Sequence, residues 1–228
     1  MIKGQEMRVY RLDPVQSARN NMVRSQLKPN GVVNRTILNI FNEISRENFV
    51  PVSLYAMAYG DATIFCGVPG RYIFAPQTLG LFLQNLNLVP NDKVLLIGGN
   101  YGYTATVLTE LECQVFVIES QPTLLSKCRE KLKKYNTVIE SGPLKLGLAE
   151  HGPYQAIIIE VGLKEVPNEI VNQLADGGRV ALCIVNDVDQ LSRAHVFEKK
   201  MESLDQVISF EANMPLCLEL DESIKFRF

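Results

Sequence analysis

Short apolar runs alternate with stretches of helical periodicity between residues 93 and 185. The apolar runs are typical of strands that are buried on both faces of a sheet, and they are KVLLIG, QVFVIE, TVIE, YQAIIIE and GGRVALCIV. We expect helices between them at about 103–111 and 123–135, and another after Pro167 that carries Ile170, Val171 and Leu174. This alternation predicts an α/β fold with a doubly wound, mostly parallel sheet.

The two ends of the chain have different patterns. Residues 14–75 predict helices and loops, among them a helix that Asn34 caps and whose apolar stripe is Ile37, Leu38, Phe41 and Ile44. The glycines, prolines and aromatic residues from 51 to 76 predict a long structured loop, after which Pro76 suits the first turn of a helix. The segments QVISFEA and SIKFRF alternate apolar and polar residues, as antiparallel edge or hairpin strands do. We expect one domain, with a helical and loop segment at 1–75 and an α/β core at 76–228.

Composition narrows the classes of function. The 228 residues carry a formal net charge of −2, which argues against a protein held on nucleic acid by its overall charge. No run approaches the ~18 apolar residues that a membrane helix needs, and the first residues are too polar for a secretory signal. These features predict a soluble, cytoplasmic protein.

Cysteine and histidine usage speaks against a metal centre. The five cysteines lie far apart without a C-x-x-C pair, which favours reduced, mostly buried thiols, and we expect Cys66 to be buried and inert. The two histidines, His151 and His195, are too few for a multi-histidine site, and we expect both at the surface. The basic residues between 127 and 134 predict a solvated helix face.

A glycine-rich turn marks the end of the first apolar run. Residues 98–102 are Gly-Gly-Asn-Tyr-Gly, and Glu119 ends the next predicted strand about 20 residues later. Ligands of open parallel sheets bind at the carboxyl ends of the strands, where an acidic residue in this position can accept ribose hydroxyls. Taken alone, the glycine-rich turn is also compatible with a tight connection between a strand and a helix. Taken alone, Glu119 is also compatible with an ordinary acidic residue at the surface. Together they favour a ligand that contains adenosine. The spacing does not match G-x-G-x-x-G, so a nicotinamide enzyme is a weaker alternative than an S-adenosylmethionine enzyme.

From Arg19 to Pro215 the chain resembles the protein-L-isoaspartate O-methyltransferase family. The resemblance lies in an ordered series of blocks: RNNMVRSQLKPNGVVNRTIL, SRENFVP, AYGDATI, VLLIGGNYGYTATVLTEL, GLAEHGPYQAIIIE and EVPNEIVNQLADGGRVALCIV. It implies a Rossmann-like domain that uses S-adenosylmethionine to methylate the free carboxylate of L-isoaspartyl residues in damaged proteins or peptides. The charge, the hydropathy and the cysteine and histidine usage described above predict no nucleic-acid, membrane or metal partner. The cofactor-binding residues that it implies are Gly98, Gly99, Asn100, Gly102, Tyr103, Glu119 and Gly142.

The sequence departs from the family pattern at several site positions. The substrate-binding segment of the family has the pattern Thr-Ile-Ser-Gln-Pro, whereas residues 72–76 here are Tyr-Ile-Phe-Ala-Pro. Phe74 stands at the serine position and Tyr72 at the threonine position, and Asp61 either faces the substrate or caps a turn. These three are the candidate catalytic residues.

On the cofactor side, Leu96 and Pro143 replace expected acids, and Gln155 replaces an aspartate that often begins the fourth strand region. The losses predict an unusually apolar site. They keep open a catalytically silent binding protein or a methyltransferase with another acceptor. Scarcity of histidine is compatible with methyl transfer, because a carboxylate is already a nucleophile at neutral pH and needs positioning rather than a base.

Overall fold

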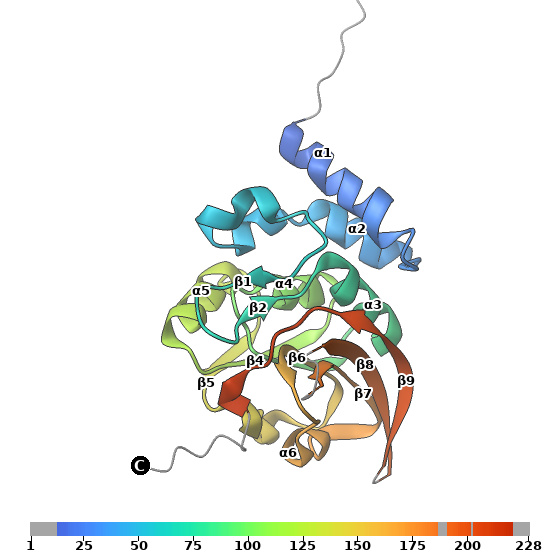
Figure 1. Cartoon of the computed structure of the whole chain (residues 1–228). Coiled ribbons are helices and arrows are strands. Elements are labelled where there is room, and N and C mark those ends of the chain that lie inside the picture. Colours follow the sequence, from blue (N-terminus) through green and yellow to red (C-terminus); the bar gives the residue numbers. More distant parts are fainter. Residues whose placement is uncertain (1–12, 187–190, 202, 221–228) are drawn as a thin grey trace, which may run out of the picture.

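A seven-stranded sheet lies at the centre of the computed structural model, which describes residues 13–186, 191–201 and 203–220 (Figure 1). The strand order is β5-β4-β3-β6-β7-β8-β9. Strands β3 to β7 pair in parallel, whereas β8 and β9 pair antiparallel. The expected α/β fold with a doubly wound, mostly parallel sheet is confirmed. The strand bounds are β3 Lys93–Ile97, β4 Gln114–Glu119, β5 Val138–Ser141, β6 Tyr154–Leu163, β7 Leu174–Val185, β8 Ser192–Lys200 and β9 Ser203–Ala212.

The apolar strands are buried because both faces of the sheet are covered. Successive residues of β3 enter different clusters: Val94 and Leu96 join one core, and Leu95 and Ile97 join the other. Helices α3 (Pro76–Leu86), α4 (Tyr103–Glu110) and α5 (Pro122–Leu132) contribute to the first core. Helix α6 (Asn168–Val171) and the 3₁₀ helix Leu144–Leu146 contribute to the second. Strand β3 lies between β4 and β6, so the order of the parallel strands reverses there.

The N-terminal segment lies over one side of this α/β core (Figure 1). Its helices are α1 (Pro14–Asn21), a π-helix (Met22–Leu27), α2 (Arg35–Glu43) and the 3₁₀ helices Arg46–Phe49 and Val52–Met57. The side chain of Asn34 accepts hydrogen bonds from the N–H groups of Thr36 and Ile37, which confirms the predicted cap of α2. The expected loop before Pro76 contains a small antiparallel hairpin of β1 (Ile64–Phe65) and β2 (Tyr72–Ile73).

The sequence prediction was wrong at two elements. The helix after Pro167 has four residues and ends before Leu174, which begins β7. Strand β8 was not predicted, because its polar residues hide the period of two by which Ala194 and Val196 are buried. QVISFEA forms part of β9 as expected, while SIKFRF lies outside the described residues. Among the described residues, none of the helices has the length and apolar character that crossing a membrane requires.

Candidate cofactor site

The glycine-rich turn joins β3 to α4, as the sequence predicts. Three of its residues have positive φ: Gly98 at 86°, Asn100 at 47° and Gly102 at 84°. A β-carbon at Gly99 would lie 2.6 Å from Cγ1 of Val117, so the turn can pack this tightly against β4 only with glycine there. The backbone of the turn is therefore held at the carboxyl end of the central strand.

Glu119 lies beside this turn, at the end of the neighbouring strand β4. The N–H of Asn100 donates to Oε2 of Glu119 at 3.0 Å, and the N–H of Gln121 donates to Oε1 at 2.9 Å. The N–H of Gly142, the first residue after β5, donates to the Glu119 carbonyl at 3.4 Å. The structure thus brings together the turn, Glu119 and Gly142, which the sequence predicted as parts of one site.

Arg71, which the sequence analysis missed, lies on the same carboxylate. Its Nη2 is 2.9 Å from Oε1 of Glu119, 2.6 Å from Oγ of Ser120 and 3.1 Å from Oε2 of Glu219. The side chains of Arg71 and Glu119 are both 0% exposed. Burial raises the pKa of Glu119, while the Arg71 guanidinium and the two backbone N–H groups oppose that rise. Nothing in the local sequence, a loop of glycines and a proline, marks Arg71 as a partner of Glu119.

A second buried glutamate, Glu160, lies on β6 at the other side of β3. Its Oε1 accepts hydrogen bonds from the N–H of Phe74 at 3.1 Å and from Oγ1 of Thr104 at 2.8 Å. Burial raises the pKa of Glu160 to about 7, against the effect of these hydrogen bonds and of the Arg46 guanidinium. Glu160 was not predicted, although the sequence carries a signal for it. The run IIIE ends in a carboxylate in the same way as the run FVIE, which ends in Glu119.

The substrate-segment residues contact this region mainly through their backbone. The Phe74 ring is fully buried and packs edge-on against Phe82, with ring centroids 5.2 Å apart. The Phe74 carbonyl accepts a hydrogen bond from Nη2 of Arg46 at 2.6 Å. The ring of Tyr72 lies against Phe65, and its carbonyl accepts from Nδ2 of Asn100 at 3.1 Å. Strand β2 is thereby tied to the glycine turn by main-chain groups.

Two other predicted site residues have contacts of a structural kind. Asp61 is exposed, and its Oδ1 accepts from the N–H of Gln77 at 3.2 Å, in the first turn of α3. This is the turn-capping alternative for Asp61. Tyr103 is buried, with Arg46 4.4 Å above its ring centroid and Phe49 edge-on to it. Its side chain packs against the N-terminal segment.

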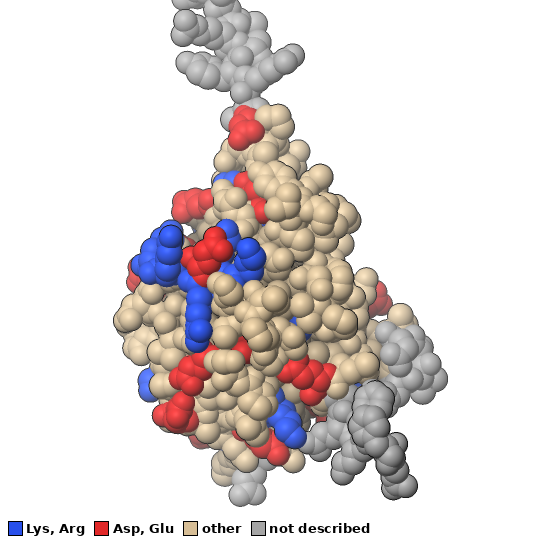
Figure 2. Space-filling model, turned by 90° about the vertical axis from the view of Figure 1, so that its left-hand side faces the viewer, with Lys and Arg blue, Asp and Glu red and all other residues tan. Residues whose placement is uncertain are grey.

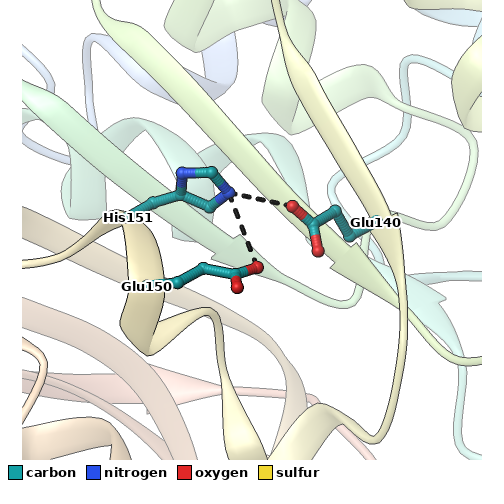
Figure 3. A group of neighbouring side chains, drawn as sticks. All are labelled: Glu140, Glu150 and His151. Carbon is teal, nitrogen blue, oxygen red and sulfur yellow. Dashed lines mark hydrogen bonds and ion pairs between the residues drawn. The ribbon is translucent and has the colours of Figure 1, made fainter.

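The two histidines are half-buried and lie at the surface, as expected. Nε2 of His151 lies 2.9 Å from Glu140 and 3.7 Å from Glu150, and the three side chains converge in Figure 3. Their ligand atoms lie within 4.8 Å of one another. The ring of His151 also packs on Phe116, with centroids 5.0 Å apart. These contacts explain the position of His151 as a hydrogen-bonded, ring-packed residue.

The remaining surface and thiol predictions agree with the structure. All five cysteines are free, and burial raises the pKa of the Cys66 thiol, which makes it a poor nucleophile. Lys127, Arg129, Lys133 and Lys134 are exposed, which confirms the solvated face of α5. Figure 2 shows basic and acidic side chains interleaved on the side of the molecule that it presents.

Comparison with known proteins identifies the family. The family model for protein-L-isoaspartate(D-aspartate) O-methyltransferase (PCMT) matches residues 17–214. The chain belongs to this family. A protein-L-isoaspartate O-methyltransferase of Syntrophus aciditrophicus is 33% identical over 85% of this chain and 92% of its own length. That of Aeropyrum pernix is 37% identical over 75% of this chain and 68% of its own length.

Solved structures show the same fold. A protein-L-isoaspartate O-methyltransferase structure superposes with a TM-score of 0.73 at 26% identity, covering 87% of this chain and 65% of its own. A Plasmodium falciparum PCMT in complex with S-adenosyl-L-homocysteine has a TM-score of 0.69 at 18% identity, covering 90% of this chain and 97% of its own. The Rossmann-like methyltransferase fold that the sequence resemblance implied is confirmed.

The residues of the site fit the S-adenosylmethionine of the PCMT family in type, with one conflict. The left-handed turn allows a ligand to approach the backbone closely, and Glu119 is the acid at the end of the second strand. Both carboxylate oxygens of Glu119, however, already accept hydrogen bonds, and Oε1 also carries the Arg71 ion pair. The Arg71 guanidinium thus lies on the same carboxylate that would accept the ribose hydroxyls.

Proposed function

We propose that this PCMT-family protein is an S-adenosylmethionine-dependent methyltransferase that esterifies the free carboxylate of L-isoaspartyl residues in damaged proteins. The observation that carries the proposal is the Gly98–Gly102 turn joined to Glu119 by the Asn100 N–H, at 3.0 Å, at the reversal point of the sheet. The family match over residues 17–214 supports the reaction and the substrate class.

The chain's own residues would bind and orient rather than move protons. When bound, S-adenosylmethionine supplies an electrophilic methyl group on a sulfonium. Glu119 would accept the ribose hydroxyls, and the backbone of the glycine turn would lie against the nucleoside. The substrate carboxylate is a nucleophile as it stands, so positioning and exclusion of water account for the protein's contribution. His151 and His195 are engaged with Glu140 and Gln206, which agrees with a reaction that needs no histidine base.

We further propose that the N-terminal segment forms the substrate side of a single methyltransferase-like domain. Strand β2 reaches the glycine turn through the Tyr72 carbonyl, and Phe74, the residue after the strand, reaches Glu160 through its N–H. Among the candidate catalytic residues Tyr72, Phe74 and Asp61, only Asp61 is exposed. Five free thiols fit a reducing compartment, which supports a cytoplasmic location.

The experiment is a methylation assay with the full chain. The protein is incubated with methyl-labelled S-adenosylmethionine and a peptide that contains one isoaspartyl residue, and base-labile methyl ester is counted. The matched control is the same peptide with a normal aspartyl residue. Ester on the isoaspartyl peptide alone is the expected result. Equal, background-level label on both peptides would contradict the proposed function.

A further inference from the structure

The guanidinium of Arg71 occupies the place beside Glu119 and the glycine turn where a ribose would bind. A β-carbon built on Gly98 would lie 3.1 Å from Nη1 of Arg71, so the guanidinium uses the close approach that this glycine permits. Nη2 of the same group is 2.9 Å from Oε1 of Glu119. The Arg71 guanidinium therefore lies against both the glycine turn and the Glu119 carboxylate, to which the proposed function assigns the nucleoside.

The C-terminal segment holds Arg71 in this place. Cys217 donates its N–H to the Gly162 carbonyl at 2.9 Å, which fixes the segment on the end of β6. A β-carbon on Gly70 would lie 3.0 Å from Cα of Cys217, so the Arg71 loop and this segment are in close backbone contact. Glu219 then adds the outer carboxylate, with Oε2 3.1 Å from Nη2 of Arg71. Figure 1 shows the segment crossing from β9 toward β5 in front of the strands.

The contacts of Arg71 are concentrated on one of its three guanidinium nitrogens. Nη2 has three acceptors within hydrogen-bond distance, whereas Nε and Nη1 have no partner among the described residues, although both are buried. Unpaired N–H groups in a buried position carry a desolvation cost. Displacement of the guanidinium from Glu119 therefore forfeits the hydrogen bonds of Nη2 alone.

We propose that Arg71 is an internal competitor for the cofactor site: it occupies Glu119 in the cofactor-free protein and must leave that carboxylate for an adenosine ribose to bind. The inference rests on the proposed function, because it assigns the ribose to Glu119. Binding then takes place only from the fraction of molecules in which Arg71 has released Glu119. The apparent Kd is higher than the intrinsic Kd by the inverse of that fraction.

Calorimetric titration with S-adenosylhomocysteine, which binds without turnover, tests the competition. Arg71→Met removes the guanidinium and keeps an apolar stem of similar length, and we expect it to bind about tenfold more tightly than the wild type. Glu219→Gln leaves Arg71 on Glu119 and removes only the outer partner, and we expect a gain of about twofold. This second variant keeps the test valid should Arg71→Met not fold.

Glu198→Gln is the matched control. Glu198 pairs with Arg179 at 2.7 Å and is 24% exposed, against 30% for Glu219, but it lies on β8 outside the site. The affinity of the Glu198→Gln variant for S-adenosylhomocysteine should equal that of the wild type. Unchanged or weaker binding by both Arg71→Met and Glu219→Gln, beside a wild type that binds, would overturn the competition and leave the proposed function standing. Absence of binding by wild type and variants alike would overturn both.

Discussion

Glu119 and Glu160 are two buried carboxylates with matching positions and different neighbours. One lies at the end of β4 and the other on β6, on either side of β3. Glu119 has a buried guanidinium within 2.9 Å, whereas Glu160 is held by the Phe74 N–H and the Thr104 hydroxyl, with Arg46 acting at longer range. Burial raises the pKa of both carboxyl groups. At Glu119 the Arg71 guanidinium is the largest influence against that rise, whereas at Glu160 the hydrogen bonds from Phe74 and Thr104 oppose it more than Arg46 does.

Removing Arg71 should give the largest effect on the free energy of unfolding. Arg71→Met leaves the carboxylate of Glu119 buried without its charge partner, which we expect to cost about 3–5 kcal/mol in urea unfolding. The double variant Arg71→Met, Glu119→Gln removes both charges and should recover part of this loss. The two residues are not coupled if Glu119→Gln lowers the free energy of unfolding by the same amount in the Arg71→Met protein as in the wild type.

Replacing Phe74 by the serine of the family pattern should be nearly as costly. The ring packs edge-on against Phe82 in the core, and deletion of such a ring costs about 3–5 kcal/mol. The control is Phe65→Ser in the same hairpin, where the ring is 41% exposed and the expected loss is smaller. Thermal unfolding of Phe74→Ser at the wild-type temperature would contradict the core position.

The pH dependence of stability should show the titration of Glu160. The pKa of Glu160 is about 7 in the folded protein against an ordinary 4.5, so the folded state binds more protons between these values. Stability due to this group is therefore present below pH 4.5 and falls as pH rises to about 7, by about 3 kcal/mol.

Glu160→Gln should remove this pH dependence and be more stable than the wild type above pH 7. Urea unfolding at several pH values measures it, with the exposed Glu211→Gln as a control that keeps the wild-type slope. Identical slopes for wild type and Glu160→Gln would place the titration on another group.

The smallest expected loss of stability comes from the capping hydrogen bond between Asp61 and the first turn of α3. Asp61→Ala removes the acceptor for the Gln77 N–H in the first turn of α3, which begins two residues after Phe74, and should cost about 1 kcal/mol. Asp61→Asn keeps an acceptor and should cost less. Equal losses for the two variants in thermal unfolding would argue against the cap.

The comparison of the two glutamates also shows what a sequence can predict. The apolar runs predicted strands β3, β4, β6 and β7 because burial on both faces leaves an uninterrupted signal. The run TVIE also predicted β5, although none of the residues of β5 is buried. The turn and Glu119 followed from their spacing along the chain. Arg71 could not be predicted, because it reaches Glu119 across 48 residues from a loop without periodicity. Phe74 and Asp61 were recognised by position in the family pattern, but their packing and capping roles depend on tertiary contacts with Phe82 and Gln77.

A crystal structure of the wild-type protein with S-adenosylhomocysteine is the most direct test of the central claim. We expect ribose hydroxyls within hydrogen-bond distance of the Glu119 carboxylate, and the Arg71 guanidinium displaced from its present 2.9 Å contact with that carboxylate. A complex in which Arg71 still pairs with Glu119 while the ribose is bound elsewhere would contradict it.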